Sequence, residues 1–167
     1  LDTNTLSYLV NTNDPLHAPV KDRFDALPEG DVVCVSVVTV GEVEYGIQAN
    51  PAMPLERASE LRRSLLEHRP LDLVKSMGET YGRIRSSLFS AHGKKHKGKR
   101  PEQLVDPVTS LQLGVQENDI WIAALAVDRA LTLVTHDKKM LPLWRAAGES
   151  LQVVDWVDGS VLWPLSS

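Results

Sequence analysis

The sequence has almost no cysteine, no long apolar run and no visible targeting signal. Its only cysteine, Cys34, lies in an apolar stretch, so we expect a small core residue and no disulfide within the chain. Asp31 and Glu42 bracket the longest apolar stretch, which is too short to span a membrane. No secretory signal peptide is visible, and a cytoplasmic protein without membrane contact is the simplest interpretation.

Several common catalytic signatures are also missing. The motifs HExxH, paired CxxC, P-loop and GxGxxG are absent, which disfavours zinc proteolysis and nucleotide binding. The first residue is leucine rather than methionine. A strand ending at Asp2 would need further apolar residues, so we expect the natural chain to begin earlier.

The net charge of −4 disfavours extensive coating by nucleic acid, although a local basic patch remains compatible with it. The segment 92–100 holds five lysine and arginine residues, namely Lys94, Lys95, Lys97, Lys99 and Arg100. This run is suited to following an RNA backbone, or it is a solvated loop. Arg83 and Arg85 are further phosphate-binding candidates, with a solvated helix surface as the alternative.

Strand-like and helical segments alternate along the 167 residues, which suits one domain. We expect strands at 31–37, 71–74, 131–135 and 151–154. We expect helices at 15–27, 38–48, 54–68, 75–90, 118–130 and 138–147. The alternation predicts an α/β fold with a mostly parallel sheet. We assign residues 1–155 to the domain, 93–117 to a basic loop insertion, and 156–167 to a C-terminal tail.

Four acids, Asp2, Glu42, Asp119 and Asp137, lie where a strand is expected to pass into a helix. Such junctions line the carboxyl edge of a parallel sheet, so these side chains are predicted to meet in one pocket. Clustered carboxylates repel one another unless a proton or cation intervenes, which points to a hard divalent metal ion. The neighbours expected to orient these acids or a bound water are Asn4, Thr39, Asn118 and Thr135.

Each acid also has a structural interpretation. Asp119 and Asp137 suit helix N-caps, and Asp2 suits the end of a strand. Glu42 follows Thr39 by three residues, the spacing of a capping box, but Ser36 is an equally good N-cap that would place Glu42 inside the helix. His136 touches the last acidic motif, and we interpret it as a loop histidine beside a cap.

The motifs around the four acids resemble those of the PIN domain, most closely the bacterial toxin ribonucleases of the VapC type. The matching segments are Leu1-Asp2-Thr3-Asn4, residues 40–47, residues 118–124 and residues 133–137. The resemblance implies a three-layer α/β/α fold with a central, mostly parallel sheet. It also implies an endoribonuclease that depends on Mg²⁺ or Mn²⁺, paired with a cognate antitoxin and often a homodimer.

Within that resemblance, Asp2, Glu42 and Asp119 are the expected metal ligands, directly or through water. Asp137 would hold a second metal ion or orient the attacking water. Many relatives carry asparagine at the place of Asp137 and aspartate three residues later, where this chain has Met140. Asp137 is therefore the fourth acid, or the site has only three.

Two other functions stay open from the sequence. A phosphatase of the haloacid-dehalogenase type would use Asp2 as its nucleophile, but its motif needs an aspartate where this chain has Asn4. The other is a non-catalytic RNA-binding module that kept a PIN-like fold, and four retained acids argue against it.

Overall fold

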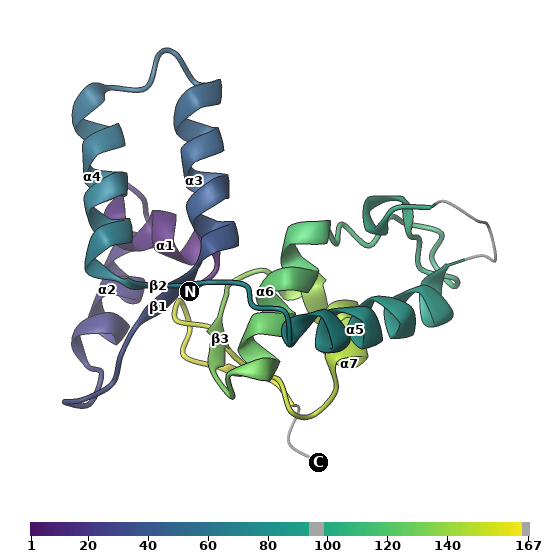
Figure 1. Ribbon diagram of the computed structural model, residues 1–167. Coiled ribbons are helices and arrows are strands. Elements are labelled where there is room, and N and C mark those ends of the chain that lie inside the picture. The colour runs from purple at the N-terminus through teal and green to yellow at the C-terminus, as the bar shows by residue number, and fades with distance from the viewer. Residues whose placement is uncertain (94–98, 165–167) are drawn as a thin grey trace. The chain divides into compact units, whose positions relative to one another are not determined.

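The computed structural model describes residues 1–93 and 99–164, which form two compact units (Figure 1). The first unit contains residues 1–73 together with 134–136 and 154–160, and the second contains the other described residues. No helix in these ranges has both the length and the apolar content needed to cross a membrane.

Four helices and one parallel strand pair build residues 1–73 of the first unit. They are α1 (Thr3–Val10), α2 (His17–Asp25), β1 (Cys34–Ser36), α3 (Val37–Ala49), α4 (Leu55–Glu67) and β2 (Arg69–Leu71). Strand β1 pairs in parallel with β2, so that Val35 lies opposite Pro70. Helices α3 and α4 lie side by side (Figure 1).

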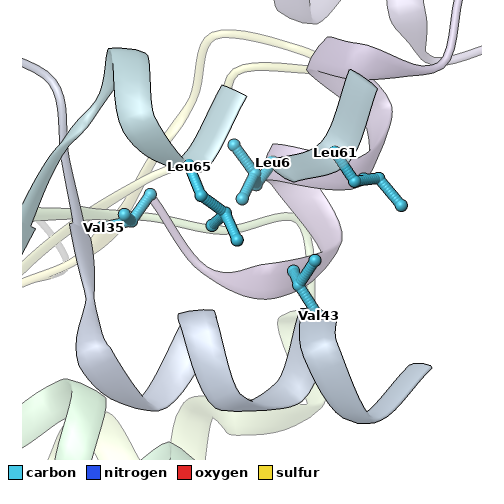
Figure 2. Packing of buried hydrophobic residues seen from close by; sticks show 5 residues of the cluster. All are labelled: Leu6, Val35, Val43, Leu61 and Leu65. Carbon is cyan, nitrogen blue, oxygen red and sulfur yellow. The ribbon is translucent and has the colours of Figure 1, made fainter. Parts of the chain in front are cut away.

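A cluster of buried aliphatic side chains joins the elements of this unit (Figure 2). It contains Leu6 from α1, Val35 from β1, Val43 from α3, and Leu61 and Leu65 from α4. Leu6 lies one turn beyond Asp2, and Val43 directly follows Glu42. The cluster therefore fixes the spacing between the two helices that carry the first two candidate acids.

The second unit packs α5 (Met77–His92) against α6 (Glu117–Asp128) and α7 (Leu141–Ala147). Helix α5 buries Met77, Ile84 and Leu88 on one face, which is the helical spacing expected from the sequence. Two short 3₁₀ helices, η1 (Pro101–Gln103) and η2 (Lys138–Met140), lie between the longer elements. A three-stranded sheet has the strand order β3 (Thr132–Val134), β4 (Gln152–Val154) and β5 (Val161–Trp163).

The predicted α/β class is confirmed by this alternation of helices and strands. The last predicted helix is divided into η2 and α7. Pro142 lies in the first two positions of α7, where proline favours the start of a new helix. The segment 93–117, predicted as a loop, contains η1 and an antiparallel bridge between Val105 and Gln112. The predicted tail contributes strand β5.

Candidate active site

Asp2 is held at the N-terminus of α1 by contacts from two parts of the first unit. Its Oδ1 accepts the backbone N–H of Thr5 at 2.7 Å, which makes Asp2 the N-cap of the helix. Its Oδ2 accepts the hydroxyl of Thr135 at 2.5 Å, and its own N–H donates to the carbonyl of Val134 at 3.0 Å. Both carboxylate oxygens thus have fixed donors.

The pKa of Asp2 is raised above its ordinary value because burial penalises the charged carboxylate. The hydrogen bonds from Thr135 and Thr5 act in the opposite direction, since they favour the ionised form. A nearby cation would offset the penalty of burial.

Glu42 lies inside α3 because the helix begins earlier, at Ser36. The Ser36 hydroxyl accepts the N–H of Thr39 at 2.9 Å and caps the helix. The Glu42 carboxylate accepts the hydroxyl of Thr3, the residue next to Asp2. Thr3 therefore links the second candidate acid to the N-terminus of α1, where Asp2 is the N-cap.

Asp119 and Asp137 lie in the second unit, where each makes a contact at a helix start. Asp119 is in the first turn of α6, and its Oδ2 accepts the N–H of Gln116 at 2.6 Å. Asp137 caps η2 by accepting the N–H of Lys139 at 2.9 Å. The N-cap interpretation is therefore correct for Asp137 and wrong for Asp119, because Gln116 is the N-cap of α6 and Asp119 is the third residue of that helix, where it closes a capping box.

The four predicted neighbours of the acids have different positions. Thr135 contacts Asp2 as described, whereas the Thr39 side chain lies 3.1 Å from the Ser36 hydroxyl and is fully buried. Asn4 is exposed, and Asn118 is half-buried beside Asp119. Sequence reasoning missed Thr3, which nothing local distinguishes from other threonines.

The predicted phosphate-binding arginines are engaged within the second unit. Arg83 donates to the carbonyl of Ala147 at 3.1 Å. Arg85 donates to the hydroxyl of Tyr81 at 2.6 Å and forms an ion pair with Glu117 at 3.0 Å. Arg100 is exposed and Lys99 half-buried, while Lys94, Lys95 and Lys97 lie outside the described residues.

Asp2 and Glu42 fit part of a site for Mg²⁺ or Mn²⁺. Both supply hard oxygen ligands, and each receives a threonine hydroxyl of the kind that orients metal-binding carboxylates from the outer shell. Across residues 1–93 and 99–164, no group of three or more His, Cys, Asp and Glu side chains is placed to hold a metal ion.

Comparisons with known proteins show a family and a fold for the chain. The family model described as "PIN domain" matches residues 1–143. The crystal structure of VapBC2 from Rickettsia felis, bound to a DNA fragment from its promoter, is similar with a TM-score of 0.67 at 19% identity. The alignment covers 93% of this chain and 96% of that one. The structure of FitAB bound to the IR36 DNA fragment gives a TM-score of 0.63 at 22% identity, with 93% of both chains covered. The comparison with curated proteins finds no match.

Proposed function

The chain belongs to the PIN domain family, and we propose that it is an endoribonuclease that depends on Mg²⁺ or Mn²⁺. The observation that carries this proposal is that two motif carboxylates, Asp2 and Glu42, each accept a threonine hydroxyl. Both acids occupy motifs that resemble those of VapC-type toxin ribonucleases. The family match spans Asp2, Glu42, Asp119 and Asp137 alike.

The candidate residues have different roles in the proposed reaction. Asp2, Glu42 and Asp119 would hold the cation, directly or through water, and Thr3 and Thr135 donate hydrogen bonds to the Glu42 and Asp2 carboxylates respectively. A bound Mg²⁺ or Mn²⁺ would stabilise the negative charge that develops on the phosphodiester oxygens and lower the pKa of an attacking water. Asp137 would orient that water or help to hold a second cation.

We also propose that the substrate is RNA and that the protein is the toxin of a toxin–antitoxin pair. Two similar structures are complexes named VapBC2 and FitAB, which supports a cognate antitoxin as a partner. The basic residues Lys94 to Arg100 would contact the RNA backbone and make binding sensitive to salt. We further propose that the protein is a homodimer and that it acts in the cytoplasm.

Cleavage of a folded RNA by the purified chain tests this function, with Glu42→Gln and Glu44→Gln as a matched pair. Glu44 lies on the same helix but pairs with Arg62 at 2.8 Å and is partly exposed. We expect cleavage only with Mg²⁺ or Mn²⁺. We expect losses of at least about 100-fold in Asp2→Asn, Glu42→Gln and Asp119→Asn, because even indirect partners of a metal ion are worth about 10–100-fold.

Glu44→Gln should cleave at the wild-type rate. Cleavage that persists in EDTA would refute the metal mechanism. Cleavage by Asp2→Asn and Asp119→Asn at the wild-type rate would refute it as well. Turnover of a small phosphate ester through a covalent intermediate on Asp2 would instead favour the phosphatase.

A further inference from the structure

His136 and Asp155 form a hydrogen-bonded pair in the first unit, beside the contacts that hold Asp2. The Nδ1 atom of His136 lies 2.8 Å from Oδ2 of Asp155, whose side chain is completely buried. The other oxygen of Asp155 accepts the N–H of Val157 at 2.8 Å. The ring of Tyr8 from α1 meets the His136 ring edge-on, with centroids 6.5 Å apart. His136 is therefore held in one orientation and is more than the loop histidine expected from the sequence.

The segment Val134–His136 supplies the groups that fix Asp2. The carbonyl of Val134 accepts the N–H of Asp2 at 3.0 Å and the hydroxyl of Thr5 at 3.5 Å. Thr135 donates its N–H to the carbonyl of Val154 at 3.0 Å and its hydroxyl to Asp2 at 2.5 Å. Because threonine is branched at Cβ, the position of its hydroxyl follows the position of its backbone.

The backbone of Thr135 is anchored on both sides. Val134 fixes the N-terminal side through its bonds to α1, and the ring of His136 fixes the C-terminal side through Asp155. A completely buried carboxylate holds a hydrogen-bond donor tightly, since charge-assisted bonds in a low-dielectric interior are strong. Loss of the ring contact would release only the C-terminal side.

We propose that the His136–Asp155 hydrogen bond positions the Thr135 hydroxyl on Asp2 and thereby sets how tightly Asp2 holds a divalent cation. This inference rests on the proposed function, because it requires that Asp2 binds metal. His136 is a positioning residue in this scheme, acting through Thr135. The removal of outer-shell partners of metal-binding groups typically weakens metal affinity by about 10–100-fold, so an effect of about tenfold is expected.

Calorimetric titration of the full-length chain with Mn²⁺ tests the proposal through two opposite substitutions. His136→Phe keeps a ring beside Tyr8 and loses the donor, whereas His136→Asn loses the ring and keeps an N–H near the position of Nδ1. We expect the Mn²⁺ dissociation constant to rise about tenfold in His136→Phe and to stay within about threefold of wild type in His136→Asn. His17→Ala is the control. It removes a different histidine contact to Tyr8, between His17 of α2 and the backbone carbonyl of Tyr8 in α1. It should leave the constant unchanged.

Thr135→Val tests the same connection at its other end and does not disturb the ring contact. It should weaken Mn²⁺ binding about tenfold, and the double variant Thr135→Val/His136→Phe should be no weaker than Thr135→Val alone. Full additivity in the double variant, or wild-type affinity in folded His136→Phe, would overturn the inference and leave the proposed function intact. Absence of Mn²⁺ binding by the wild-type chain would instead refute both.

Discussion

Leu6→Ala should destabilise the first unit strongly, because Leu6 lies in the middle of the cluster that joins α1, α3 and α4 (Figure 2). Its side chain is 0% exposed. The substitution deletes three carbon groups worth about 0.8 kcal/mol each when buried, or roughly 2.4 kcal/mol. The residual cavity adds to this loss, as buried Leu→Ala changes cost about 2.7–5.0 kcal/mol in a well-studied series. We therefore expect a loss of about 3 kcal/mol.

Urea unfolding followed by circular dichroism measures this loss, and Leu66→Ala is the matched control. Leu66 neighbours the cluster residue Leu65 on α4 but is 83% exposed, so its truncation should change stability by no more than about 0.5 kcal/mol. Equal losses in the two variants, or a loss below about 1 kcal/mol for Leu6→Ala, would show that the cluster does not hold α1 against α3 and α4.

Four further substitutions test the electrostatics and the backbone. Burial raises the pKa of Asp2, so its contribution to stability is complete below the unfolded pKa of about 3.9 and is lost as the pH rises through the folded pKa. Metal-free Asp2→Asn should thus unfold at higher urea concentration than wild type at pH 7, and equal midpoints would contradict this. Burial lowers the pKa of His68, so wild type should lose stability relative to His68→Phe as the pH falls below about 6.5; parallel pH profiles would be the contrary result. Gly46 lies within α3, so Gly46→Ala should stabilise the protein by about 0.5–1 kcal/mol. Gly159 has φ +76°, so Gly159→Ala should destabilise it by about 1–2 kcal/mol. Thermal melts in which both substitutions shift the melting temperature in the same direction would contradict this prediction.

The elements that local signals specify were predicted well. Ser36 and Thr39 were both predicted as possible N-caps, and the structure selects Ser36, which places Glu42 inside the helix. Asp119 and Asp137 were recognised as acids at helix starts for the same reason. The α/β class and the PIN resemblance are confirmed as well, since alternating patterns and short motifs are local in sequence.

Contacts between distant residues escaped the sequence reasoning. The hydroxyl of Thr3 reaches Glu42 across 39 positions, and Arg85 reaches Glu117 across 32. No periodicity encodes such pairs, because they depend on how elements pack. The pairing of His136 with Asp155 was missed for the same reason. Helix α1 was not delimited, since its polar first turn, with Thr3, Asn4 and Thr5, lacks an apolar pattern.

The central proposal, drawn from the family motifs, is that Asp2, Glu42 and Asp119 take part in binding a divalent cation. Anomalous diffraction from crystals of the full chain soaked in Mn²⁺ tests it most directly, because the signal locates the ion independently of activity. The account predicts an anomalous peak within about 2.0–2.6 Å of carboxylate oxygens from these residues, or one water molecule away, and its loss in Asp2→Asn crystals. A peak that contacts none of the three residues, or no peak at saturating Mn²⁺, would contradict it.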